Sequence, residues 1–184
     1  MNLTPAQTAV IAATEPYLLV SAGPGAAKTT VLLARVARLI ADGVPAERIV
    51  AISFTISAAH ELAERFSQSN KGAAPLFSTL HSFLLRLLTR YGQVIGLGQS
   101  LSVVDQEEQE ALLDDVMTET AYRGNMKAVK FEVAKGPIVR LNPMTTAEIA
   151  AEAFWQRLKA DGILTYDSIL HHGERLLKAM SAKG

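Results

Sequence analysis

Residues 21–30 read Ser-Ala-Gly-Pro-Gly-Ala-Ala-Lys-Thr-Thr, and this stretch narrows the fold more than any other. The apolar run from Tyr17 to Val20 precedes it and predicts a strand that is covered on both faces. After it, apolar residues recur at helical spacing until Asp42-Gly43, at Leu32, Val36, Leu39 and Ile40. A strand, a glycine-containing loop and a helix in this order predict a loop that binds phosphate.

The two residues that end the loop have side chains suited to a nucleotide. In phosphate loops, backbone N–H groups surround the anion, a lysine reaches the terminal phosphates, and the next hydroxyl supplies a magnesium ligand. Lys28 and Thr29 match these roles, so they are the candidate catalytic residues, with Thr29 holding Mg²⁺ through ATP. The candidate nucleotide-binding residues of the loop are Ala22, Gly23, Pro24, Gly25, Ala26, Ala27, Lys28, Thr29 and Thr30. The alternative is a strand-to-helix turn with a solvent-exposed lysine.

Two alanines depart from the usual loop pattern, Gly-x-x-x-x-Gly-Lys-Ser/Thr. Ala22 and Ala27 stand at the two glycine positions. At Ala27 a methyl group lies next to the N–H groups that should touch the phosphates, so we expect it to hinder close approach of the anion. Descent from a nucleotide-binding loop and tight binding of ATP by this chain are therefore separate hypotheses.

The segments around the loop predict an α/β fold. Thr4 and Gln7 form a capping-box pattern that opens a helix ending near Ala13. A second buried strand is expected at residues 49–54, with a helix from about Ser57 to Phe66, and a third strand at 76–79 leads into another helix. Successive strand–helix units indicate a parallel sheet flanked by helices.

The later part of the sequence is expected to be mainly helical. Asp105 begins a capped acidic helix, and at about Ala121 the composition changes to a basic stretch, residues 123–140. Further helices are predicted after Thr145 and from Tyr166 to Met180, with Trp155 in the core. We expect two domains, residues 1–120 around the phosphate loop and residues 121–184 as a smaller helical lobe.

Composition limits the class of protein. Eighteen basic and eighteen acidic residues give zero formal charge, so contact with nucleic acid has to come from local clusters. The chain has no cysteine, which excludes disulfides and thiolate metal sites. It has no basic-then-apolar leader and no apolar run of the ~18 residues that a membrane helix needs, which favours a cytoplasmic protein.

Four segments taken in order resemble the UvrD/Rep-type superfamily 1 DNA helicases: residues 3–7, 22–30, 51–65 and 78–83. The segment 102–105 and the helix start at 164–170 are also similar to that family. The resemblance implies a P-loop NTPase fold with a RecA-like sheet and an inserted helical lobe. It implies ATP and Mg²⁺ as cofactors, single-stranded DNA as partner, and translocation from 3′ to 5′ driven by ATP hydrolysis.

The resemblance also assigns roles to individual residues. It implies that Gln7 contacts adenine, although Gln7 also completes a helix cap with Thr4, and the two roles can coexist. It implies that DNA is bound by Phe54, Thr55, Ser57, His81 and Ser82. The family pattern at 53–59 is Thr-Phe-Thr-Asn-Lys-Ala-Ala, and here Ile56 and Ser57 replace the Asn-Lys pair, which predicts weaker strand binding. Burial of Phe54 at a strand end and helix capping at His81 and Ser82 are the structural alternatives.

Three hypotheses for function remain from the sequence. Up to Gly184 we find no Asp-Glu pair after a buried strand, which these ATPases need to orient water, so we expect a nucleotide-binding part that is not competent in hydrolysis alone. The changes at Ala27, Ile56 and Ser57 favour instead a degenerate helicase-like binding domain. A small P-loop kinase shares the loop but leaves the segments at 53–59 and 78–83 unexplained.

The basic stretch 123–140 is either a nucleic-acid path or a solvated surface.

Overall fold

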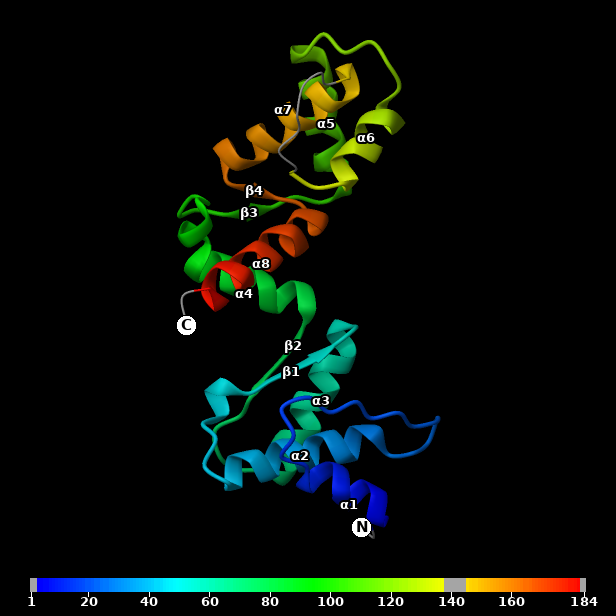
Figure 1. The fold of residues 1–184 in the computed structure, drawn as a ribbon, viewed down its shortest axis with the longest axis vertical. Coiled ribbons are helices and arrows are strands. Elements are labelled where there is room, and N and C mark those ends of the chain that lie inside the picture. Colours follow the sequence, from blue (N-terminus) through cyan, green and yellow to red (C-terminus); the bar gives the residue numbers. More distant parts are fainter. Residues whose placement is uncertain (1–2, 138–144, 183–184) are drawn as a thin grey trace. The chain divides into compact units, whose positions relative to one another are not determined.

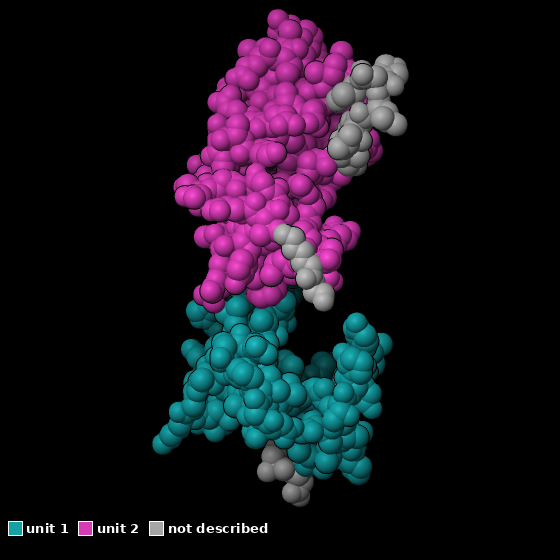
Figure 2. Space-filling model, turned by 60° about the vertical axis from the view of Figure 1, so that its left-hand side comes forward, with its two compact units in different colours: residues 1–80 teal, residues 81–184 magenta. Residues whose placement is uncertain are grey.

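The computed structural model describes residues 3–137 and 145–182. They fold into two units, residues 1–80 and 81–184, which Figure 2 shows in teal and magenta. Elements are labelled as in Figure 1. Each unit has its own small parallel pair of strands surrounded by helices, so the expected mixture of helix and parallel strand is confirmed.

The first unit follows the predicted order of elements closely. Its elements are α1 (Pro5–Ala12), α2 (Lys28–Ala41), the short 3₁₀ helix η1 (Ala46–Arg48), β1 (Val50–Ser53), α3 (Ile56–Ser69) and β2 (Leu76–Thr79). The strands β1 and β2 are parallel, with Val50 opposite Leu76 and Ser53 opposite Thr79. Helix α3 connects them, as parallel pairing requires. Val36, Ile49 and Phe66 form the buried core of this unit.

The prediction of a strand at residues 17–20 is wrong. This segment forms no strand, and the described strands β1 and β2 pair with each other and not with it. Tyr17 and Leu19 are 92% and 95% exposed, whereas Leu18 and Val20 are 43% exposed. An apolar run becomes a strand only when another strand supplies hydrogen bonds to its backbone, and no described residue does so here. The side chains of this run therefore alternate between nearly full and partial exposure, but its backbone does not pair with a strand.

The second unit is mainly helical. It contains α4 (Leu80–Tyr91), the 3₁₀ helix η2 (Gly92–Ile95), β3 (Ser102–Val103), α5 (Gln106–Glu119), α6 (Met126–Ala134), α7 (Thr146–Asp161), β4 (Ile163–Leu164) and α8 (Tyr166–Ser181). The short strands β3 and β4 are parallel and far apart in sequence, with Ser102 opposite Ile163. Their pairing ties the segment before α5 to the segment after α7.

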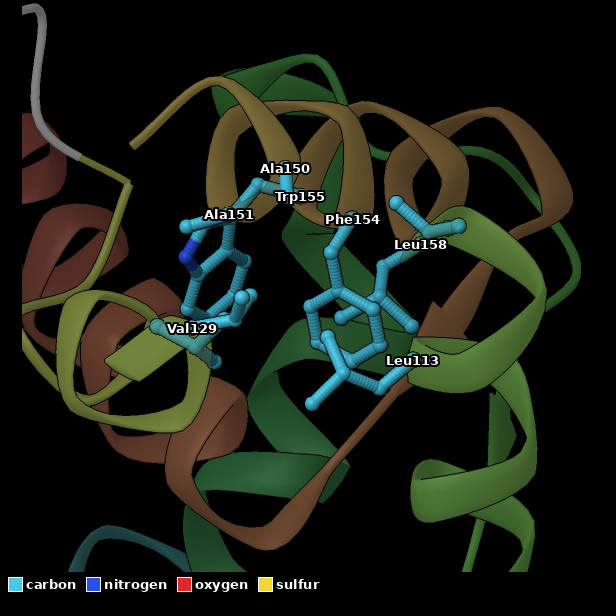
Figure 3. Packing of buried hydrophobic residues seen from close by; sticks show 9 residues of the cluster. Leu113, Val129, Ala150, Ala151, Phe154, Trp155 and Leu158 are labelled. Atoms are coloured by element: carbon cyan, nitrogen blue, oxygen red, sulfur yellow. The ribbon is translucent and has the colours of Figure 1, made fainter. Parts of the chain in front are cut away.

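Two apolar clusters hold the second unit together. One joins α5, α6 and α7, and Figure 3 shows Phe154 and Leu158 of α7 pointing toward Leu113 of α5, with the Trp155 indole beside Val129 of α6. Trp155 is 6% exposed, which confirms its predicted place in the core. The other cluster joins α4, α8 and the residues around η2, through Leu84, Leu88, Leu97, Leu164, Ile169 and Leu176.

Capping explains where several helices begin. The predicted capping boxes at Thr4, Asp105 and Thr145 are all present, and Thr165 forms another with Ser168 at the start of α8. Helix α6 was not predicted, because its stretch is rich in basic residues and its only buried residues are Val129 and Val133. The expected domain boundary near Ala121 falls between α5 and α6, inside the second unit, and stays a prediction.

None of the helices in the described ranges is both long enough and apolar enough to cross a membrane.

Candidate nucleotide-binding site

The loop at residues 22–27 turns tightly into the first residue of α2. The N–H of Ala26 donates to the carbonyl of Gly23 at 3.4 Å, and Gly25 has a φ of 75°. Ala27 is the N-cap of α2, with φ 55° and ψ 32°, in the left-handed region. The chain therefore reverses over four residues and directs the first N–H groups of α2 toward the loop.

Ala27 is held in a conformation that suits glycine. A residue with a Cβ at positive φ costs roughly 1 kcal/mol or more, because the Cβ crowds its own carbonyl. The sequence predicted that the Ala27 methyl would hinder an anion, and the structure adds that the residue is strained before any ligand arrives. Sequence alone does not show this strain, since it depends on φ.

The start of α2 also lacks a side-chain cap. Thr, Asp or Asn side chains accept from the first turn in α1, α3, α5, α6, α7 and α8. At α2 the N-cap is Ala27, which forms no side-chain cap bond. Its first-turn N–H groups thus receive no acceptor from the N-cap, and they carry the positive end of the helix dipole. These are the groups on which an anion binds.

Lys28 lies across this loop. Its Nζ donates to the carbonyl oxygens of Ala22 at 2.9 Å and Gly23 at 2.8 Å. These two bonds hold the ammonium against the backbone of the loop. Phosphate oxygens in the loop would compete with these two carbonyls for the same cation, and the charged pair is the stronger one.

A pocket of about 880 Å³ opens beside the loop, entirely within the first unit. Its polar lining residues include Gln7, Ser21, Lys28 and Thr29, and its apolar lining residues include Leu18, Val20, Val31, Leu32, Ile52 and Leu62. The structure thus brings Gln7, Ala22, Ala26, Lys28 and Thr29 together around one cavity. Gly23, Pro24, Gly25, Ala27 and Thr30 lie in the adjoining loop and first helical turn.

The pocket contains residues that the sequence did not single out. Arg35 lines it from two turns into α2, and Glu61 lines it from α3. The spacing of seven residues between Lys28 and Arg35 places both on the same face of a helix, a signal that was present in the sequence. Glu61 had no such signal, and its carboxylate is 2.6 Å from Arg65.

Gln7 performs the predicted capping and also reaches the phosphate loop. Its Oε1 accepts from the N–H of Thr4 at 2.8 Å, and its own N–H donates to Thr4 Oγ1 at 3.3 Å. The Nε2 donates to the carbonyl of Ala26 at 3.2 Å. The Gln7 Oε1 keeps one further lone pair and Nε2 keeps one further hydrogen, so the side-chain amide can form additional hydrogen bonds.

The residues expected to bind DNA fall in both units. In the first unit, Phe54 is 98% exposed, Ser57 is exposed, and Thr55 caps α3 by accepting from the Ala58 N–H at 3.1 Å. Burial at a strand end is thereby excluded for Phe54. In the second unit, His81 is in the first turn of α4 with its ring 5.3 Å from that of Tyr166, and Ser82 is exposed.

The basic stretch is partly neutralised where the structure describes it. Lys130 Nζ is 2.6 Å from Glu110 Oε1, and this hydrogen bond lowers the pKa of the Glu110 carboxyl. Lys135 pairs with Glu132 at 2.7 Å and lies over the Phe131 ring at 4.5 Å. These contacts favour the solvated-surface interpretation for two of the cations. Arg140 lies outside the described residues.

Comparison with known proteins now decides the family. The family model of the UvrD/REP helicase N-terminal domain matches residues 3–182. The chain belongs to the UvrD/Rep helicase family. The resemblance seen in the sequence is confirmed, and it extends over the weakly similar second half as well.

Three relatives show how much of a UvrD/Rep protein is represented. The chain is 31% identical over 175 residues to the ATP-dependent DNA helicase PcrA of Leuconostoc citreum, covering 91% of this chain and 23% of that protein. It is 37% identical over 106 residues to the ATP-dependent DNA helicase SRS2 of Saccharomyces cerevisiae, covering 54% and 9%. It is 33% identical over 129 residues to a Staphylococcus aureus PcrA, covering 68% and 17%. The chain thus spans less than a quarter of the length of these relatives.

Proposed function

We propose that residues 1–80 bind ATP with Mg²⁺ on the loop at 22–30, and that the chain is the ATP-binding part of a cytoplasmic DNA helicase or translocase with 3′–5′ polarity. The proposal includes a RecA-like P-loop fold for this unit. The observation that carries it is the position of Lys28 at the uncapped start of α2, inside a pocket that Gln7 also lines. The relatives are ATP-dependent DNA helicases by name.

The residues around the pocket fit a nucleoside triphosphate. No atom lies within 4 Å of where a Cβ would stand at Gly23 or Gly25, so the loop backbone is accessible. The phosphates would be held by the N–H groups of α2 and by Lys28, with Thr29 as the protein ligand of Mg²⁺. The adenine edge would meet the unused hydrogen and lone pair of the Gln7 amide.

The same pocket does not contain a carboxylate that is ready to activate water. Among the described residues that line it, the acidic one is Glu61, which is paired with Arg65. Bound ATP supplies the phosphoryl group, while this chain binds and orients it. We therefore propose nucleotide binding without steady hydrolysis by this chain alone.

Titration calorimetry with Mg²⁺ and a non-hydrolysable ATP analogue tests the proposed site. The unaltered chain should bind one equivalent, and Lys28→Ala should lose at least tenfold in affinity because a charge-assisted contact to phosphate is removed. Lys71→Ala is the control, since Lys71 is an exposed lysine of the same unit outside the pocket lining. Equal binding by all three proteins would rule the site out.

A degenerate binding domain is the second candidate, because Ala27 is strained at the position where the loop must approach phosphate. In that case the surface around Phe54 would serve a DNA or protein partner without nucleotide. The two candidates differ in one respect: only the first predicts that relieving the strain at Ala27 produces or improves ATP binding.

A further inference from the structure

The helix that carries Gln7 is held in place mainly by polar contacts. Helix α1 has eight residues and none of them is buried. Isolated helices shorter than about 12 residues are marginal in water even with good sequences. The position of α1, and with it that of Gln7, therefore depends on what α1 contacts in the rest of the first unit.

Two arginines of α2 bind the carboxyl end of α1. Arg35 Nη1 donates to the carbonyl oxygens of Val10 at 2.7 Å and Ala13 at 2.8 Å, and Arg38 Nη1 donates to that of Ile11 at 2.8 Å. The last carbonyls of a helix have no partner within the helix and carry partial negative charge. A guanidinium is the side chain best suited to bind several of them at once.

Arg35 connects this contact to the phosphate loop. It is seven residues after Lys28, which places it on the same face of α2 and about 10 Å further along the axis. At its other end α1 is attached to the loop through the bond from Gln7 Nε2 to the Ala26 carbonyl. Helix α1 is thus hydrogen-bonded to the loop through its own Gln7 and to α2 through Arg35 of that helix. Both residues line the pocket.

We infer that Arg35 is a positioning residue for recognition of the nucleotide base: by binding the carboxyl end of α1, it holds Gln7 beside the phosphate loop. The inference rests on the proposed function for the role of Gln7. Arg38 has a secondary part, because its Nε is also paired with Asp42 at 3.0 Å. Arg35 uses Nη1 for both of its α1 contacts and acts on the base through Gln7.

Comparing a ligand that has a base with one that has none distinguishes an effect of Arg35 on base recognition from an effect on phosphate binding. Dissociation constants would be measured with Mg²⁺ for the ATP analogue and for inorganic tripolyphosphate, which has no base. Arg35→Met should weaken the ATP analogue roughly tenfold, which corresponds to about one lost hydrogen-bonded contact, and leave tripolyphosphate within about twofold. Gln7→Ala should give a similar loss, and the double variant should lose no more than either single one.

Amide exchange of residues 3–13 provides a readout that needs no nucleotide. Arg35→Met should speed exchange in α1 while α3 exchanges as before, which also shows that the unit is folded. Arg35→Lys should be intermediate in both measurements, since an ammonium reaches fewer carbonyls. Arg48→Met, an exposed arginine of η1 outside the pocket lining, is the matched control and should change neither.

Several results would overturn the inference. Unchanged exchange in α1 would show that Arg35 does not hold the helix. Losses of Arg35→Met and Gln7→Ala that add up would mean that Arg35 contacts the nucleotide independently, and equal weakening of tripolyphosphate would mean that it acts on the phosphate loop. If the unaltered chain binds neither ligand, the proposed nucleotide site fails, while the exchange result still decides whether Arg35 holds α1.

Discussion

Ala27 combines two features that would oppose the proposed binding of phosphate. Its backbone is left-handed, which a Cβ disfavours, and its methyl lies at the start of α2, where in the proposed site an anion would approach the N–H groups. Ala121 is the other described alanine with positive φ, at 53°. It lies in the second unit, far from the loop in sequence, and therefore provides a comparison in which strain is present without a ligand site.

Replacing Ala27 by glycine should stabilise the first unit. Relief of the left-handed strain outweighs the added freedom of the unfolded chain, for a net gain of about 0.5–1 kcal/mol in the free energy of unfolding. Urea denaturation measures this directly. Ala26→Gly, at the neighbouring residue without positive φ, should be neutral or destabilising, and the strain account is wrong if both variants behave alike.

His172 makes the stability of the second unit depend on pH. It is 7% exposed, and its Nδ1 has no hydrogen-bond partner among the described residues. Burial, together with the smaller effects of the charges of Arg175, His171 and Lys159, lowers its pKa to about 4. The unfolded chain has the ordinary pKa of about 6.5, so it binds more protons than the folded one between these values.

The contribution of His172 should be complete above pH 6.5 and lost as the pH falls toward 4. We expect a loss on the order of 1–3 kcal/mol over that range. The measurement is the difference between the unfolding free energies of the unaltered chain and His172→Leu at pH 7 and pH 4.5. His60→Leu, at an exposed position of α3, serves as control. A difference that does not change with pH would contradict this account.

Phe54 is suited to stacking on a base because its ring is almost fully exposed. If the first unit binds single-stranded DNA, Phe54→Ala should weaken binding on the order of tenfold, the range for loss of one aromatic stacking contact. Fluorescence anisotropy with a labelled oligothymidine at low salt measures it. Tyr17→Ala removes a similarly exposed ring outside residues 53–59, and an equal effect of both would show that the contact at Phe54 is not specific.

At the scale of elements, sequence patterns predicted what local chemistry decides. Residue types at fixed spacing predicted the helix caps at Thr4, Asp105 and Thr145. They also predicted the loop before Lys28 and the strands found at 50–53 and 76–79. The strand expected at 17–20 was wrong because pairing depends on a distant partner. Helix α6 was missed because its stretch is rich in basic residues and has few buried positions. The pairing of β3 with β4 was missed because each strand has two residues, too few to show a pattern.

The candidate site was predictable to a similar extent. Gln7, Lys28 and Thr29 follow from their spacing in the sequence and from the family resemblance, and they lie around one pocket. The left-handed backbone of Ala27 and the bonds from Arg35 to α1 were not predictable, since each depends on torsion angles or on contacts between helices.

Close packing of α8 against α4 limits what residue 173 can be. A Cβ on Gly173 would stand 2.8 Å from Leu84 Cδ1, in the apolar cluster that joins the two helices. Glycine to alanine inside a helix is normally favourable by about 1 kcal/mol. Here Gly173→Ala should instead lower the free energy of unfolding by about 1–3 kcal/mol through overpacking.

A double-mutant cycle with Leu84→Ala isolates this packing contact. In the Leu84→Ala background, space is available and Gly173→Ala should become neutral or stabilising. Thermal unfolding of the four proteins gives the coupling energy. The same destabilisation by Gly173→Ala in both backgrounds would mean that Leu84 does not restrict residue 173.

At the scale of the whole molecule, one unit carries the pocket proposed to bind nucleotide, and the other unit is mainly helical with its own apolar clusters. With zero formal charge, the chain has no overall attraction for DNA, so any strand binding would have to come from local contacts, such as those proposed around Phe54. The chain covers 23% of the PcrA relative from Leuconostoc citreum. Hydrolysis coupled to movement on DNA therefore stays a proposal about a protein of the length of these relatives. Nucleotide binding can be tested on this chain itself.

The most direct test of the central claim is calorimetric titration of Ala27→Gly and of Ala27→Gly with Lys28→Ala, using Mg²⁺ and a non-hydrolysable ATP analogue. Ala27→Gly should bind at least about fivefold more tightly than the unaltered chain, and adding Lys28→Ala should abolish that gain. Ala121→Gly should leave affinity unchanged, because it relieves strain away from the loop. Absence of binding by Ala27→Gly, or binding that does not depend on Lys28, would contradict the account of residues 22–30 as a strained but competent phosphate loop.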